Sequence, residues 1–107
     1  MQRLRIAAVT LAVFALPAAA RADVGQRKFN AKCASCHGKD GKGQTEMGQK
    51  YKVSDLGSRD VQAKLTDEAM LKQITDGNEA KKMPAFKDKL SEDEIKAVAA
   101  YVRTLAK

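Results

Sequence analysis

Apolar residues recur at helical spacing near the end of the chain. One apolar face there is formed by Ile95, Val98, Ala99, Val102 and Leu105. Positions three or four apart lie on the same side of a helix, so this segment is predicted to be an amphipathic helix. Ser91 and Glu94 have the spacing of a capping box, and Leu90 can pack on Ile95 across the start of the helix. The helix is therefore expected to begin directly after Ser91.

A second amphipathic segment lies upstream, between Thr66 and Gly77. Thr66 is a suitable N-cap, and the carboxylates of Asp67 and Glu68 suit the positive end of a helix dipole. The buried stripe of this helix is expected to consist of Met70, Leu71 and Ile74. Gly77 is expected to end the helix, because glycine readily adopts the conformation that follows a helix C-terminus.

The earlier part of the chain gives weaker signals. Asp23 can cap a first helix, with Gln26 as its capping-box partner, and Gly38 marks a stop after that helix. A short helix is predicted over Ser58–Lys64, whereas residues 45–57 give no clear assignment. No segment of the mature part alternates convincingly with a period of two. We therefore predict an all-α domain of three to five helices joined by loops.

The start of the chain has the pattern of a secretory signal peptide. Arg3 and Arg5 supply a positive beginning, and an apolar run follows over residues 6–16. Ala20-Arg21-Ala22 fits the rule of small residues at the cleavage site, which places the cut before Asp23. The alternative is an uncleaved membrane anchor, but the apolar run is shorter than the ~20 residues that a spanning helix requires. We therefore expect a periplasmic protein without stable membrane insertion.

This cut divides the chain into a signal peptide, residues 1–22, and a single domain, residues 23–107. A domain of 85 residues has a small core and usually needs an additional stabilising group. The whole chain has 20 Lys and Arg against 13 Asp and Glu, a net charge of +7, and loss of the three arginines before residue 23 lowers it to +4. This mild excess does not indicate nucleic-acid binding, but it is compatible with an acidic protein partner.

The residues with distinctive chemistry are concentrated in one short motif. The chain has two cysteines and one histidine, and all three lie within Cys33-Ala34-Ser35-Cys36-His37. This spacing is the attachment signature of c-type haem. The two thiols can add to the two vinyl groups of one porphyrin, and the adjacent imidazole can then ligate the iron in its neutral form. We therefore predict one covalent haem c, with thioether bonds at Cys33 and Cys36 and His37 as an axial iron ligand.

Three other interpretations of the motif compete with haem attachment. A thioredoxin-like dithiol normally follows a strand in a βαβ unit, and no strand is predicted before Cys33. A zinc site would need a further Cys or His ligand, which the chain does not contain. A plain disulfide between Cys33 and Cys36 would leave the adjacent His37 as a coincidence.

The second axial ligand has to come from another residue type, because His37 is the only histidine. Methionine sulfur is a soft ligand that suits haem iron in electron-transfer proteins. Met83 lies in a loop between two predicted helices, and Pro84 favours extended backbone before it. Met70 falls on a buried helix stripe, and Met47 lies in a loop only ten residues after His37. We predict that Met83 is the second axial ligand. The alternatives are a core role for Met83, ligation by Met47, and an open or water-bound site.

These motifs together resemble those of class I c-type cytochromes, in particular the small bacterial periplasmic type with one haem. The resemblance covers residues 23–107. It rests on Cys33 to Gly38, Lys39 to Gly43, Met83-Pro84-Ala85-Phe86 and Ala99-Ala100-Tyr101-Val102. It implies the cytochrome c fold, in which the first and last helices cross. Gly25 and Phe29 of the first helix would then meet Val98 and Tyr101 of the last.

The sequence departs from this family in two places. Many relatives have a proline shortly after the haem-binding histidine, near the carbonyl that orients the imidazole, and this chain has none there. A backbone carbonyl within residues 41–53 is therefore expected to accept the ring N–H of His37. The chain also has no Trp to hold a haem propionate, and Tyr51 is a candidate substitute.

The predicted function is that of a soluble single-electron carrier with His/Met axial ligation of the haem iron, rather than an enzyme. Its partners are expected to be redox proteins, with no nucleic acid among them, and the protein is expected to be a monomer. Lysines near the haem edge could steer an acidic partner. Those in segments expected to border the haem are Lys28, Lys32, Lys39, Lys42, Lys81, Lys82 and Lys87.

Two alternative functions stay open from the sequence. With an open sixth position, the haem could bind small gases or react with peroxide, although no distal His or Arg pair is evident. The domain could also be a cytochrome subunit of a larger respiratory complex.

Overall fold

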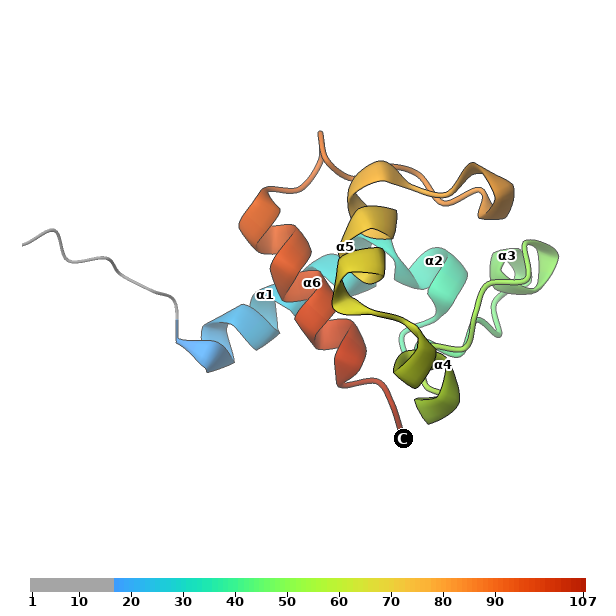
Figure 1. Ribbon diagram of the computed structural model, residues 1–107, viewed down its shortest axis with the longest axis horizontal. Coiled ribbons are helices and arrows are strands. Elements are labelled where there is room, and N and C mark those ends of the chain that lie inside the picture. The colour runs from blue at the N-terminus through green and yellow to red at the C-terminus, as the bar shows by residue number, and fades with distance from the viewer. Residues whose placement is uncertain (1–16) are drawn as a thin grey trace, which may run out of the picture.

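The computed structural model describes residues 17–107, and this part of the chain is helical (Figure 1). The elements are α1 (Ala18–Lys32), α2 (Ala34–His37), α3 (Glu46–Lys50), α4 (Arg59–Lys64), α5 (Asp67–Asp76), the 3-10 helix η1 (Glu79–Lys81) and α6 (Glu92–Arg103). The only β pairing within these residues is an isolated bridge between Asn78 and Met83. The all-α prediction is confirmed. The described residues form six α-helices rather than three to five, because the short helices α2 and α3 are separate elements.

Helix α1 begins earlier than the sequence predicts. It starts at Ala18, with Pro17 as its N-cap, so Asp23 does not cap it in the uncut chain. Asp23 lies inside the helix, and its carboxylate pairs with Arg27 one turn later at 3.3 Å. The alanines before residue 23 extend the helix because alanine has the highest helix propensity. Most of the predicted signal peptide lies outside the described residues, and no helix within residues 17–107 is long and apolar enough to cross a membrane.

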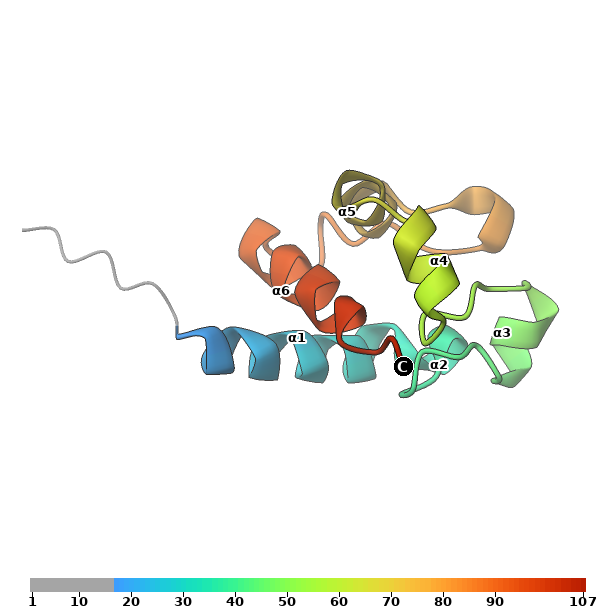
Figure 2. The same cartoon turned by 60° about the horizontal axis from the view of Figure 1, so that its bottom comes forward.

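Helices α1 and α6 cross in close contact, as both views show (Figures 1 and 2). At the crossing, Gly25 lies against the backbone of Ala97, and a Cβ at position 25 would lie 3.0 Å from that of Tyr101. The rings of Phe29 and Tyr101 meet with centroids 5.4 Å apart. Phe29 and Val98 are each only 1% exposed. The predicted meeting of the two helices is therefore confirmed, and glycine is required where their backbones approach.

The predicted helix starts in the second half of the chain are also confirmed. The Ser91 hydroxyl accepts a hydrogen bond from the Glu94 amide at 3.1 Å, and the Glu94 carboxylate accepts one from the Ser91 amide at 2.9 Å. Thr66 caps α5 by accepting from the Ala69 amide at 3.1 Å. These capping bonds satisfy amides that have no partner inside a helix, so the boundaries can be read from local sequence.

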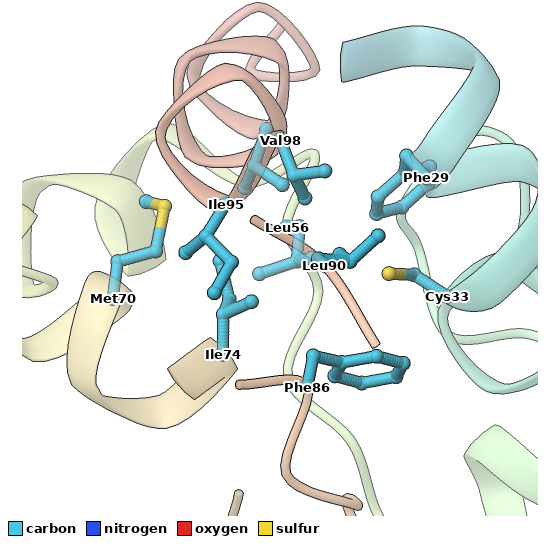
Figure 3. Close-up of a cluster of buried hydrophobic side chains, with 10 residues drawn as sticks. Phe29, Cys33, Leu56, Met70, Ile74, Phe86, Leu90, Ile95 and Val98 are labelled. Atoms are coloured by element: carbon cyan, nitrogen blue, oxygen red, sulfur yellow. The ribbon is translucent and has the colours of Figure 1, made fainter. Parts of the chain in front are cut away.

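One hydrophobic core joins α1, α5 and α6 to the segment before α6 (Figure 3). Its buried members are Phe29, Cys33, Leu56, Met70, Ile74, Phe86, Leu90, Ile95, Val98 and Val102. The predicted stripe of α5 contributes Met70 and Ile74, while Leu71 is only partly buried. Leu90 and Ile95 are both buried across the start of α6, as the predicted staple requires. In this core the Cys33 sulfur points toward the other buried side chains (Figure 3).

Candidate functional site

The Cys-x-x-Cys-His motif lies at the junction of α1 and α2. Cys33 ends α1, and its amide donates to the Phe29 carbonyl at 2.8 Å. Cys36 and His37 follow on the single turn of α2. Both thiols are free, with Cys33 buried and Cys36 partly exposed. The motif therefore presents two unpaired thiols and an imidazole from one short stretch of chain.

The loop after the motif is bonded back onto α2. Gly38 ends α2 with φ of 78°, a value that favours glycine. The Gly43 amide then donates to the His37 carbonyl at 2.7 Å, and the Thr45 hydroxyl donates to the Cys36 carbonyl at 2.6 Å. These two bonds satisfy the last carbonyls of α2. They also hold residues 38–44, a loop rich in glycine and lysine, against the motif.

The His37 imidazole is in the form that a metal binds. Burial lowers the pKa of His37, so the ring is neutral at pH 7. The ring lies 6.3 Å from that of Phe29, centroid to centroid. The prediction that a backbone carbonyl within residues 41–53 accepts the ring N–H of His37 is wrong for this structure, because His37 Nδ1 is buried without a hydrogen-bond partner. Carbonyls of that loop accept from amides of the same segment instead; the Gly48 carbonyl, for example, accepts from the Val53 amide at 3.0 Å.

Met83 is carried by a rigid turn on the opposite side of the site. Its amide and carbonyl exchange hydrogen bonds with the carbonyl and amide of Asn78, both at 2.9 Å. Gly77 lies so close that a Cβ there would be 2.6 Å from the Met83 carbonyl oxygen. Beyond the turn, the Phe86 amide donates to the Ile74 carbonyl at 3.0 Å, which fastens the segment to α5. The backbone on both sides of Met83 is therefore fixed.

Three hollows that share lining residues form one site between these two segments. Their volumes are about 70, 420 and 40 Å³, and both His37 and Met83 line each of them. We call this space the His37–Met83 cleft. Cys33 lines two of the three hollows, and Cys36 lines one. The structure thus brings together all four residues that the sequence singled out.

The other methionines are placed differently. Met47 lies on α3 rather than in a loop, and it is 39% exposed and lines none of the three hollows. Met70 is 4% exposed within the core and lines only the most apolar hollow. Met83 is therefore the methionine that lines all three hollows of the cleft together with His37.

The dithiol and zinc interpretations lose support from the geometry. Burial, and secondarily the neighbouring Cys36, raises the pKa of Cys33 to about 11, whereas a redox-active thiol requires a lowered pKa. Within residues 17–107, no group of three or more His, Cys, Asp or Glu side chains is arranged to hold a metal ion. A site of two thiols, a neutral imidazole and a thioether around an apolar space instead fits an iron porphyrin.

The structure separates the seven predicted lysines. Lys32, Lys81 and Lys82 line the cleft. Lys28 instead pairs with Glu94 at 3.1 Å, and Lys87 borders a hollow between α5 and α6. Lys39 and Lys42 line no part of the cleft.

Sequence reasoning also missed one lysine and misplaced one aromatic residue. Lys64, at the end of α4, lines the largest hollow, which its spacing in the sequence could not indicate. Tyr51, the candidate for holding a propionate, lines none of the three hollows. Its ring instead lies under the Lys50 ammonium, 5.5 Å from the centroid.

Comparison with known proteins decides the family. Residues 20–102 match the family model described as "Cytochrome C oxidase, cbb3-type, subunit III". Cytochrome c6 of Leptolyngbya boryana is 43% identical over 83 residues, covering 78% of this chain and 91% of that protein. The chain is a small class I c-type cytochrome. Cytochrome c6 of Nostoc sp. strain PCC 7120 is 41% identical over 100 residues, covering 92% of this cytochrome and 84% of that one.

The solved structures agree with this assignment. The KustC0563 c-type cytochrome is similar with a TM-score of 0.72 and 34% identity, over 78% of this chain and 98% of that chain. The protein is therefore an electron-transfer protein rather than an enzyme, it carries a covalent haem c, and it exchanges electrons with redox partners.

Proposed function

We propose that this cytochrome is a soluble one-electron carrier whose haem is attached at Cys33 and Cys36 and ligated by His37 and Met83. The observation that carries the proposal is that these four residues, from segments 46 or more positions apart, line one cleft. The haem iron, when bound, supplies the exchange between ferric and ferrous states. All other steps depend on how the chain holds and shields that iron.

Each of the four residues has a distinct role. The thiols of Cys33 and Cys36 would hold the porphyrin at the α1–α2 junction, and the neutral imidazole of His37 would ligate its iron. Met83 would supply a thioether, a ligand that stabilises ferrous iron and so would raise the reduction potential. The wall between them includes Phe29, Leu56 and other apolar side chains, which would keep water from the iron.

Substitution of Met83 tests the axial ligation. Met83→Ala is expected to abolish the weak red sulfur-to-iron absorption band of the ferric protein, because the thioether is lost. Met47→Ala is the matched control, since Met47 is exposed on α3 outside the cleft. A Met83→Ala protein that keeps the wild-type ferric spectrum would show that another group is the sixth ligand.

Export of the protein is part of the proposal. Cleavage before Asp23 would release residues 1–22 and deliver residues 23–107 to the periplasm as a monomer. Arg21, Ala22 and Asp23 are exposed near the start of α1, and cleavage would require the first turns of this helix to unwind. The intact mass of protein purified from the periplasm should correspond to residues 23–107 plus one haem. A mass that includes the first 22 residues would contradict cleavage.

The partner surface is proposed at the lysines of the cleft. Lys32, Lys64, Lys81 and Lys82 line the two hollows that reach Val53, and no Asp or Glu lines either hollow. This concentration of positive charge beside the haem favours a transient encounter with an acidic surface.

A role as a subunit is the second candidate. The family model takes its description from a cbb3-type oxidase subunit, and FixP of Azorhizobium caulinodans is 36% identical over 81 residues. The chain covers only 26% of FixP, whereas it covers 91% of the Leptolyngbya cytochrome c6. Stoichiometric co-purification with a membrane oxidase at physiological ionic strength would favour the subunit over the free carrier.

A further inference from the structure

Gln62 is the one buried polar residue among residues 17–107, and it lies behind the wall of the cleft. Its side-chain amide donates to the Leu56 carbonyl at 2.7 Å and to the Val102 carbonyl at 3.0 Å. The residues that supply these two carbonyls both line the apolar hollow beside His37. One buried side chain therefore joins the wall segment before α4 to the last helix.

Arg103 continues this network from the other side. Its Nη1 donates to the backbone carbonyl of Gln62 at 2.7 Å and to the side-chain oxygen of Gln62 at 3.0 Å. Its Nη2 donates to the Leu65 carbonyl and to the Asp67 carboxylate, the latter at 2.7 Å. Leu65 is a third lining residue of the apolar hollow, and Asp67 begins α5. The guanidinium thus fastens the end of α4 and the start of α5 to α6.

The acceptors reveal what the network does for the cleft. Three lining residues, Leu56, Leu65 and Val102, direct their backbone carbonyls to Gln62 or Arg103. A carbonyl that is hydrogen-bonded within the protein does not need water, so this part of the wall can stay dry. The polarity and solvent access around a haem are major determinants of its reduction potential.

We propose that Gln62 and Arg103 are positioning residues for the haem: they act through Leu56, Leu65 and Val102 to keep the cleft wall closed and dry, and so raise the reduction potential. This inference rests on the proposed function of the cleft. Neither the Gln62 side chain nor the Arg103 side chain lines the cleft itself. Loss of the network would admit water near the iron, and water stabilises the more highly charged ferric state.

Two substitutions that leave the net charge unchanged test the proposal. Gln62→Met keeps an unbranched side chain of similar length but loses both donors and the acceptor. Arg103→Lys keeps the positive charge beside Asp67 but loses the planar fork that reaches several acceptors. A change in potential in either variant therefore reports on the wall and not on an added or removed charge.

Ser91→Ala is the matched control, because it removes the cap of α6 at the end away from the cleft. It is expected to lower the melting temperature while leaving the reduction potential unchanged. Gln62→Met and Arg103→Lys are expected to lower the melting temperature and also the ferrous-to-ferric ratio at a fixed applied potential. We expect a decrease on the order of tenfold, which for a one-electron couple is about 59 mV.

The measurement is a redox titration of each holoprotein beside its thermal melt. Wild-type potentials in both variants, together with melts lowered as in Ser91→Ala, would overturn the proposal and assign the network to stability alone. Unchanged melts and potentials would overturn it equally. If Gln62→Met does not fold, Arg103→Lys decides, since it retains the buried glutamine. Failure of the proposed function would be recognised separately, as a wild-type protein without covalent haem.

Discussion

The α1–α6 crossing and the His37–Met83 cleft are two halves of one small domain with opposite properties. At the crossing, protein fills the space: Gly25 lies against the opposing backbone, and Phe29 and Val98, which also form part of the cleft wall, are 1% exposed. At the cleft, apolar and polar side chains together surround a hollow of about 420 Å³, which has two smaller neighbours. The crossing is held by its own side chains, whereas the cleft is hollow and is lined by the residues that we propose as haem ligands. The cofactor is therefore expected to contribute most of the stability on the cleft side.

Removing the haem attachment should expose this difference most strongly. Cys33→Ala combined with Cys36→Ala is expected to abolish covalent haem and to cause the largest loss of stability, because the cleft loses the group around which it closes. Amide hydrogen exchange should then be fast in α3, α4 and residues 78–86, with any surviving protection in α1 and α6. Ser35→Ala, in the same motif, should retain haem and wild-type exchange. Equal loss of protection in both halves would refute the comparison.

The crossing itself should be intolerant of a single methyl group. Gly25→Ala would place a Cβ in contact with the Ala97 backbone, so the helices must separate. The cost is expected to be about 3 kcal/mol in the free energy of unfolding, despite the better helix propensity of alanine. Gly57→Ala is the control, because the nearest atom to its Cβ would be a side-chain oxygen of Asp55 at 3.1 Å. Denaturant unfolding of the holoproteins should separate the two, and equal stabilities would contradict close packing.

Charge reversal at the cleft should change kinetics and leave the crossing intact. Lys82→Glu is expected to slow oxidation of the ferrous protein by ferricyanide, an anionic reagent, by about threefold at low ionic strength. Lys72→Glu makes the same change in net charge on α5, where Lys72 lines none of the three hollows, and should have less effect. Stopped-flow rates over a range of salt concentrations measure the difference. If both variants respond alike, only net charge acts and the cleft lysines have no special role.

The smallest expected effect concerns the start of α6. Hydrogen bonding from Ser91, followed by the interaction with Lys28, lowers the pKa of Glu94 below its usual 4.5. Because the folded pKa lies below the unfolded one, the stabilisation is complete above about pH 4.5 and is lost as the pH falls through the folded value. Glu94→Gln should therefore flatten the acid limb of a pH–melting temperature curve slightly. Retention of the wild-type slope would assign that limb to other carboxylates.

The features that sequence could predict are local ones. The capping box of α6, the Thr66 cap of α5 and the haem motif each lie within a few residues, so their spacing alone carries the information. The loop position of Met83 was predictable because Pro84 and the flanking helix signals mark that loop, while ligation of the iron by Met83 stays a prediction. The packing of Gly25 against Tyr101 was suggested by family resemblance rather than by spacing.

The features that sequence could not predict depend on distant partners. Gln62 and Arg103 are 41 positions apart, and neither has a local pattern that marks it. Burial of His37 Nδ1 without an acceptor depends on how the loop after Gly38 uses its carbonyls. Nothing in the sequence around Lys28 distinguishes it from the lysines that line the cleft, yet its position on α1 places its side chain beside Glu94. Each of these three features depends on contacts between residues that are distant in the sequence.

The most direct test of the account is the visible spectrum of the periplasmically matured protein, recorded oxidised and reduced. Covalent haem between His37 and Met83 predicts a low-spin spectrum, with the weak red sulfur-to-iron band in the ferric form and with haem that resists acid–acetone extraction. A high-spin spectrum that changes on addition of carbon monoxide or cyanide would contradict ligation by Met83 and favour an open sixth position. Haem that acid–acetone removes would contradict attachment at Cys33 and Cys36.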